Sequence, residues 1–198
     1  MPSGQAVPTL LVHDGGLGAM VAAMTLPAPA RAYAWGTRPD AAAFARRHAE
    51  ALGMAGVLVH DDPAPAGPLR TSRTLLAACA AAVEQGCPVI LWPHNAGHDV
   101  RTLADAADIA RLVARAAAID NGGRGRPGQP TAGGGVSDLR IDAPFLDMSD
   151  VQLAELALDL EAPLDPGWWD DADHARWARA FEAARDRLRR PLAASPLG

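Results

Sequence analysis

Residues 9–23 read TLLVHDGGLGAMVAA, and this stretch decides the fold class of the chain. It begins with an apolar run suited to a β-strand that ends at His13, and a segment of small and apolar residues suited to a helix follows Gly16. Gly15 and Gly16 lack a Cβ atom, so the backbone can turn sharply here and approach a ligand closely. The free N–H groups at the start of a helix favour an anion. The stretch therefore predicts a strand, a tight turn and a helix, with a ligand above the end of the strand.

The rest of the chain repeats this alternation of strand and helix. Strands are expected over residues 8–13, 30–35, 56–60, 88–92 and 139–143, and helices over 17–26, 40–52, 72–85, 99–118, 149–160 and 171–190. Asp40 is expected to cap its helix, and Ser149 with Gln152 is expected to form a capping box. Alternation with short connections predicts an α/β fold with a doubly wound, parallel, Rossmann-like sheet. Ligands of such folds gather at the carboxyl ends of the strands.

Residues 1–163 are expected to form this α/β domain, with a glycine- and proline-rich surface loop at about 121–135, and residues 164–198 a helical tail. The chain has 198 residues, of which 49% are hydrophobic, enough to bury a core. The formal net charge is −5, so nucleic acid and membrane surfaces are not expected partners; the chain has no lysine, and any cationic contact to a phosphate must come from arginine. Cys79 and Cys87 are interpreted as reduced, buried side chains. Without an apolar stretch of membrane length or a secretory signal pattern, we expect a cytoplasmic protein.

The glycine turn resembles the pyrophosphate-binding loop of the PP-loop ATP pyrophosphatases, which reads Ser-Gly-Gly-Leu-Asp-Ser between a strand and a helix. The glycines and the leucine of that loop are retained here, whereas both serines and the aspartate are replaced. The corresponding residues, which the resemblance makes candidates for nucleotide binding, are Asp14, Gly15, Gly16, Leu17, Gly18 and Ala19.

Three later motifs resemble those of 7-cyano-7-deazaguanine synthases, PP-loop enzymes of the pathway that leads to queuosine. Residues 68–71 (PLRT) resemble that family's Pro-Ala-Arg-Asn, and residues 92–96 (WPHNA) resemble its Gly-x-Asn-Ala-x-Asp. Residues 141–149 (IDAPFLDMS) resemble its Ala-Pro-Leu-x-x-Leu-Ser-Lys. With the glycine turn, the matches run in order from about residue 8 to residue 163. The resemblance implies an adenine-nucleotide alpha-hydrolase-like fold and a ligase that uses ATP to convert 7-carboxy-7-deazaguanine and ammonia to the nitrile.

Departures from the family pattern predict that this chemistry is weakened or lost. Asp14 stands where the loop has its first serine, Ala19 removes the hydroxyl of the second, and Asp150 replaces the lysine after Leu-Ser. Two charges about 4 Å apart interact by roughly 4 kcal/mol at an effective dielectric constant near 20, so a carboxylate beside the phosphates would oppose ATP binding. We therefore expect a diverged pseudoenzyme that binds a purine-like ligand or a protein partner, and a homodimer is left open. An active ATP-dependent ligase with altered phosphate contacts and a structural or scaffolding subunit are the alternatives.

The family's structural zinc is not expected here. Three of the four cysteines that hold it are spaced Cys-x-x-Cys-x-x-Cys before the last helix, and alignment places Trp168, Asp171 and His174 at those positions. Structural zinc sites need thiolates or imidazoles in a closed tetrahedron, which this set does not supply. His94 and His98 are four residues apart, a spacing that can pair metal ligands on a helix, but they fall in an expected loop without an obvious third ligand.

Each candidate site residue also has an ordinary structural interpretation. Asp14 is interpreted either as a catalytic carboxylate or, more commonly for its position, as a helix N-cap. Arg70 is a candidate for a substrate phosphate or carboxylate, or for a structural ion pair. Asn95 is a candidate for a nucleotide or purine, or for hydrogen bonds that stabilise its loop. His13, beside the glycine turn, is a candidate for substrate binding, with a buried, hydrogen-bonded role as the default.

Overall fold

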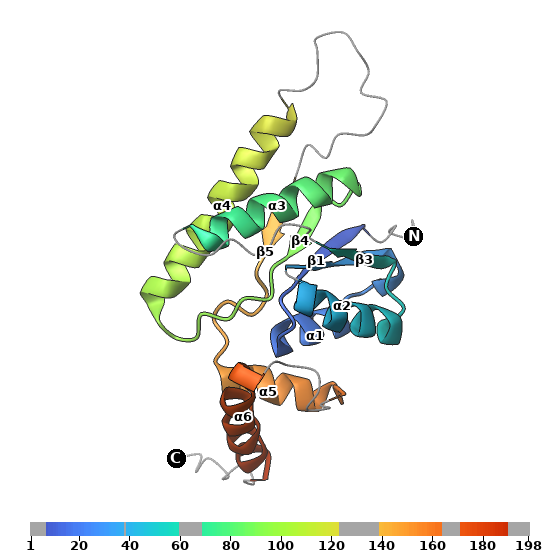
Figure 1. Ribbon diagram of the computed structural model, residues 1–198. Helices are drawn as coiled ribbons and strands as arrows, with labels where there is room; N and C mark the ends of the chain where they lie inside the picture. The colour runs from blue at the N-terminus through green and yellow to red at the C-terminus, as the bar shows by residue number, and fades with distance from the viewer. Residues whose placement is uncertain (1–6, 38, 60–68, 123–138, 164–170, 190–198) are drawn as a thin grey trace, which may run out of the picture.

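The computed structural model describes residues 7–37, 39–59, 69–122, 139–163 and 171–189. Its centre is a parallel sheet with the strand order β3-β2-β1-β4-β5 (Figure 1). The strands are β1 (Thr9–His13), β2 (Ala32–Gly36), β3 (Gly56–Val59), β4 (Val89–Leu91) and β5 (Arg140–Asp142). Every neighbouring pair is parallel, and β1 lies at the centre with Leu11 opposite Ala34 on one side and Leu91 on the other. The predicted α/β class with a parallel, Rossmann-like sheet is confirmed.

Helices cover both faces of this sheet. They are α1 (Leu17–Met24), α2 (Pro39–Leu52), α3 (Arg70–Glu84), α4 (Val100–Gly122), α5 (Asp150–Asp159) and α6 (Asp171–Arg189), with a short 3-10 helix η1 (Pro29–Arg31) before β2. Figure 1 shows α3 and α4 on one side of the sheet and α1 and α2 on the other, with α5 and α6 beyond α1. The first two crossover connections, through α1 and α2, thus pass over one face, and the next two, through α3 and α4, pass over the other, as in a doubly wound sheet.

The central strand explains why the sheet needs cover on both faces. Leu10 and Val12 pack with residues of α3 and α4, whereas Leu11, between them, packs with α1, α5 and α6. Successive side chains of a strand point to opposite faces, so a continuous apolar run places apolar side chains on both. All three of these side chains are buried, and the strand is therefore fixed as the middle of the core.

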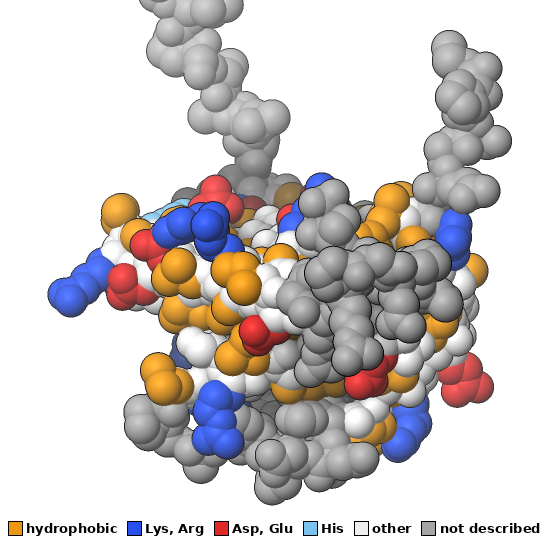
Figure 2. Space-filling model, turned by 90° about the horizontal axis from the view of Figure 1, so that it is seen from above, with side chains coloured by type: hydrophobic (Ala, Val, Ile, Leu, Met, Phe, Trp, Pro, Cys, Tyr) orange, Lys and Arg blue, Asp and Glu red, His pale blue; other side chains and the backbone are white. Residues whose placement is uncertain are grey.

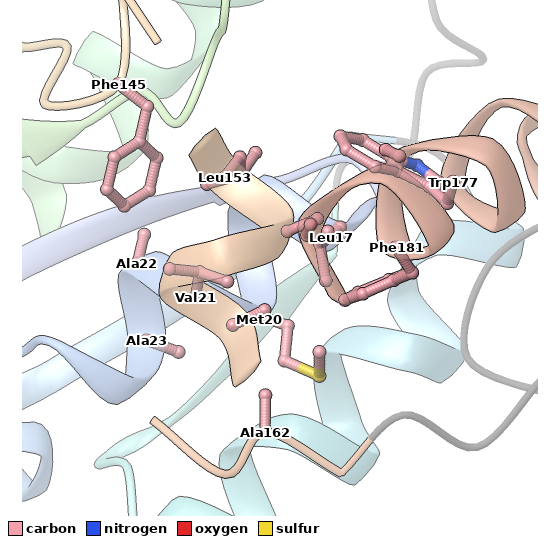
Figure 3. Packing of buried hydrophobic residues seen from close by; sticks show 14 of the residues in the cluster. Leu17, Met20, Val21, Ala22, Ala23, Phe145, Leu153, Ala162, Trp177 and Phe181 are labelled. Carbon is pink, nitrogen blue, oxygen red and sulfur yellow. The ribbon is translucent and has the colours of Figure 1, made fainter. Parts of the chain in front are cut away.

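The last helix is part of the second of these layers. Trp177 and Phe181 of α6 are buried in one cluster with Leu17 of α1 and Leu153 of α5 (Figure 3). The arginines of α6 from Arg179 to Arg189 are exposed and form a solvated face of this helix. Burial of two large aromatic side chains anchors α6 to the helices beside the sheet.

Several element boundaries differ from the expected ones. Helix α2 begins at Pro39, so Asp40 lies in its first turn and is not its N-cap; proline is favoured at this position because its missing N–H would be unbonded there in any case. Helix α3 begins at Arg70, and α4 continues to Gly122, into the start of the expected loop. The capping box is confirmed: Ser149 accepts from the Gln152 backbone N–H, and the Gln152 side chain accepts from the Ser149 N–H.

Surface charge is mixed where it can be seen from above. Figure 2 shows arginine and acidic side chains interspersed with apolar ones on this face of the described residues, without a block of one sign. None of the described helices combines the length and the apolar character needed to cross a membrane.

Candidate functional site

A cavity of about 280 Å³ lies at the carboxyl ends of three neighbouring strands, where ligands of this fold class are found. The residues after β1, β2 and β4 and the first turns of α3 contribute its walls. They are Val12, Asp14, Thr37, Arg70, Thr71, Thr74, Leu75, Trp92, Pro93 and His94. Among the candidate residues from the sequence, the structure brings Asp14 and Arg70 to this cavity, and it places His13 and Asn95 outside its lining.

The glycine turn forms as predicted, but its first two N–H groups are bonded within the chain. Gly15 has φ +89°, a conformation that glycine adopts readily because it has no Cβ atom. Its N–H donates to Nδ1 of His13 at 3.2 Å, and the N–H of Gly16 donates to Oδ1 of Asp14 at 2.9 Å. The N-cap of α1 is Gly16, so Asp14 is not the helix cap that was expected; its carboxylate closes a local turn instead.

The remaining loop residues belong to the packing of α1. Leu17 and Ala19 are buried in the core, and neither lines the cavity. A Cβ atom on Gly18 would lie 2.6 Å from the carbonyl oxygen of Pro93, closer than real Cβ contacts allow. Glycine is therefore needed at position 18 because α1 lies backbone against backbone with the segment after β4. Of the six residues that resemble the pyrophosphate loop, Asp14 alone lines the cavity.

His13 faces the core rather than the cavity. It is fully buried, and its Nε2 lies 2.7 Å from Nδ1 of His48 on α2. Because its Nδ1 accepts from Gly15, the proton of its neutral ring must be on Nε2, which donates to His48. Burial lowers the pKa of His13 to about 4, and burial together with the charges of His13 and Arg47 lowers that of His48 to about 3. Both rings are neutral at pH 7, and the default structural role of His13 describes what is found.

Helix α3 brings a cation and hydroxyl groups to the cavity. Arg70 and Thr74 are four residues apart and Thr71 and Thr74 are three apart, so one face of the first turns carries all three side chains. Arg70 is exposed, and no ion pair or hydrogen bond joins it to another residue in the part of the chain that the structure describes. The structural ion pair considered for Arg70 is therefore not formed among those residues, and its guanidinium is available to an anionic group in the cavity.

Two stacked aromatic rings form another part of the cavity wall. The rings of Trp92 and His94 are stacked, with centroids 4.7 Å apart and planes inclined by 6°. Burial lowers the pKa of His94; the carboxylate of Asp14 raises it and the guanidinium of Arg176 lowers it. The imidazole is thus neutral at pH 7, and His94 presents a flat face and uncharged ring nitrogens. His98 is exposed and does not line the cavity with it.

Thr37 is a cavity residue that the sequence did not single out. Its backbone N–H donates to the carbonyl oxygen of His13 at 3.0 Å, which fixes the turn after β2. The side chain is only 9% exposed, and within the described residues its hydroxyl makes no hydrogen bond. Thr37 directly follows a buried strand, as Asp14 does, and this position at a strand end is the signal that could have found it.

Asn95 and Asp150 are bound to each other and to the last helix. The Nδ2 of Asn95 donates to Oδ1 of Asp150 at 2.7 Å, and Nε of Arg176 donates to Oδ2 of Asp150 at the same distance. The hydrogen bonds to Arg176 and Asn95 hold the pKa of Asp150 below its usual range. Asp150 therefore carries its negative charge against a cation, and Asn95 has the loop-stabilising role that was one of its two interpretations.

Metal ligands do not gather in the described part of the chain. Among these residues no three His, Cys, Asp or Glu side chains lie close enough together to hold a metal ion. Trp168 lies outside the described residues, the side chain of Asp171 is not described, and His174 is exposed on α6. The lack of a zinc site thus stays a prediction.

Comparison with protein-family models finds no match, and comparison with curated proteins finds none either.

Proposed function

We propose that this chain is a PP-loop protein similar to 7-cyano-7-deazaguanine synthases that binds a purine-like small molecule in the cavity and has weak or no ATP turnover. The observation that carries the proposal is the state of the glycine turn. The N–H groups of Gly15 and Gly16, which would face a phosphate, already donate to His13 and Asp14.

The residues present do not fit a triphosphate. Anion sites of this kind rely on free backbone N–H groups and cationic side chains around the phosphates. Here the carboxylate of Asp14 holds one of these N–H groups and lies on the cavity wall, so a phosphate would meet a charge of its own sign. Among the described residues, Arg70 is the one arginine in the lining.

A flat, base-sized ligand suits the cavity better. Pockets that hold drug-sized ligands measure about 300–1,000 Å³, and this cavity, at about 280 Å³, lies just below that range. Trp92 and His94 offer a stacked aromatic wall, and Val12 and Leu75 offer apolar contacts. The hydroxyl of Thr37 and the charged groups of Asp14 and Arg70 would orient the ligand by hydrogen bonds.

The cellular setting belongs to the same proposal. Cys79 and Cys87 are free and buried, and burial raises the pKa of each thiol to about 11. Unreactive, unpaired thiols are common in proteins of the reducing cytoplasm, where we place this protein.

Two measurements test the proposal. In the first, purified protein is incubated with ATP, 7-carboxy-7-deazaguanine and ammonia, and pyrophosphate release is followed; we expect none above the protein-free rate. Turnover at an ordinary enzymatic rate would contradict the proposal and establish the active ligase.

In the second, the melting temperature is measured with guanine, 7-deazaguanine and ATP, because a ligand that binds only the folded state must stabilise it. We expect stabilisation by the bases and none by ATP. Arg70→Gln should reduce the effect of the bases, whereas Arg73→Gln, an exposed arginine of the same helix outside the lining, should not. No stabilisation by any base would leave the structural or scaffolding subunit as the better account.

A further inference from the structure

The loop that follows β4 forms one wall of the cavity and is held by elements far from it in sequence. Trp92 and His94 line the cavity, while the next residue, Asn95, donates to Asp150 at the start of α5. Arg176 of α6 reaches both partners. Its Nε donates to Oδ2 of Asp150 at 2.7 Å, and its Nη2 donates to Oδ1 of Asp150 at 2.5 Å and to Oδ1 of Asn95 at 3.4 Å.

We propose that Arg176 is a positioning residue for the cavity: through Asp150 and Asn95 it fixes the loop over residues 92–97 and thereby the orientation of His94. The proposal concerns the cavity wall itself, so it does not depend on which ligand the cavity binds.

The loop depends on these contacts because it contains no helix or strand of its own. The N–H of His94 donates to the carbonyl oxygen of Trp92 at 2.8 Å, and the N–H of Ala96 donates across to Leu146 at 3.0 Å. The second of these bonds attaches the loop to the segment before α5, and the side chains of Asn95 and Asp150 make a further attachment to the same region. The position of the loop over residues 92–97 is therefore set by its bonds to the segment before α5 and to Asp150.

Arg176 is suited to fix its partners rather than only to neutralise them. Two nitrogens of one planar guanidinium bind the two oxygens of Asp150, an arrangement that sets direction as well as distance. The side chains of Arg176 and Asp150 are 41% and 34% exposed, so the pair is partly shielded from water. The guanidinium also lies 4.7 Å from the ring centroid of Trp177, which is buried in the core. Arg176 is thus held on its own helix while it holds the loop.

The charge of Arg176 reaches the cavity as well. Burial lowers the pKa of His94 most, the carboxylate of Asp14 raises it, and the guanidinium of Arg176 lowers it. Removal of the arginine should therefore raise the pKa of His94, and any opening of the loop that exposes the ring should raise it further, because burial is the main cause that lowers it.

Helix α6 supplies a matched control. Arg187 pairs with Glu155 at 3.5 Å and so joins the same two helices, but neither residue lines the cavity or contacts the loop. Arg176→Gln, Arg176→Lys and Arg187→Gln are compared with the unchanged full-length protein. Hydrogen exchange is measured for residues 92–97, and the pKa of the His94 ring is measured by NMR, with His94→Gln to assign the signal.

We expect Arg176→Gln to speed exchange in residues 92–97 by about tenfold or more, since local opening becomes easier when the contacts that oppose it are removed. It should also raise the pKa of His94, while Arg187→Gln leaves both readouts unchanged. Arg176→Lys keeps the charge but loses the planar fork, so it should speed exchange with a smaller change in the pKa. If Arg176→Gln does not fold, the test is the hydrogen exchange of residues 92–97 in Arg176→Lys compared with that in Arg187→Gln. Equal behaviour of the variants at positions 176 and 187 would overturn the proposal.

Discussion

His13 and His48 lie 35 residues apart in sequence and meet inside the protein, with 2.7 Å between Nε2 of the first ring and Nδ1 of the second. The bond joins the end of the central strand to α2, and the other nitrogen of His13 accepts from Gly15. The geometry of the glycine turn therefore depends on two neutral imidazoles, because a proton added at either bonded acceptor nitrogen would face a donor.

This pair makes stability depend on pH. In the unfolded chain both histidines titrate near 6.5, whereas in the folded protein their pKa values are lowered to about 4 and about 3. Between these values the unfolded state binds more protons, so the stabilising effect is complete above pH 6.5 and is lost as the pH falls toward 4. We expect the free energy of unfolding to fall by up to about 1.4 kcal/mol per pH unit for each histidine over this window.

The measurement is urea denaturation between pH 7.5 and 4.5. His48→Gln keeps an acceptor for His13 and removes one titrating group, so its pH slope should be smaller than that of the unchanged protein by the contribution of one histidine. Equal slopes for the two proteins would show that the histidine pair is not the source of the pH dependence of stability.

Asp14→Ser should let the glycine turn accept an anion. The change removes the carboxylate that holds the Gly16 N–H and that would repel a phosphate. We expect the affinity for inorganic pyrophosphate, measured by calorimetry, to rise by about tenfold or more. Asp147→Ser removes an exposed carboxylate outside the cavity lining and is the control for net charge. An unchanged affinity in Asp14→Ser would contradict the electrostatic account of the turn.

Gly18→Ala should destabilise the protein by about 1–3 kcal/mol, the usual cost of overpacking. The added Cβ would lie 2.6 Å from the Pro93 carbonyl oxygen, a backbone atom that cannot rotate away. Gly56→Ala is a useful comparison, since its Cβ would meet the ring of Tyr33 at an ordinary 3.7 Å. Chemical denaturation of both variants measures the difference. A loss of unfolding free energy in Gly18→Ala no greater than that in Gly56→Ala would count against the close approach of Gly18 to Pro93.

Phe181→Ala should cost about 3–5 kcal/mol of unfolding free energy, as for other buried aromatic residues. Leu188→Ala on the same helix removes a side chain that is 57% exposed and should change stability by no more than about 0.5 kcal/mol. Thermal and urea denaturation of the two variants test whether α6 is an integral part of the core, and similar small losses in both would show that it is not.

The fold class could be predicted because it depends on local patterns. The apolar run at residues 9–13, the glycine turn and the capping box at Ser149 and Gln152 act within a few residues of each other, and each is found where it was expected. Helix ends were less predictable: α3 begins at Arg70, after Leu69 with φ 66°, a conformation that nothing in the leucine side chain announces.

The contents of the candidate site could be predicted only in part. Asp14 and Arg70 became candidates through motifs that resemble those of the family, and Thr37 could have been found from its position at the end of a strand. The pairing of His13 with His48 and of Asp150 with Arg176 was not, because periodicity shows which face of an element a side chain occupies and not which residue faces it across the core. Because of these pairings, His13 is bound to His48 and Asn95 to Asp150, and both side chains have structural roles.

The contact between Gly18 and Pro93 also limits what the cavity can hold. Pro93 forms part of its lining, and the backbone of α1 at Gly18 packs directly against this proline, with no side chain between them. A wall of this construction cannot widen by a change of rotamer. A ligand group too large for the space beside Pro93 would have to displace α1 itself, so this side of the cavity should discriminate by size.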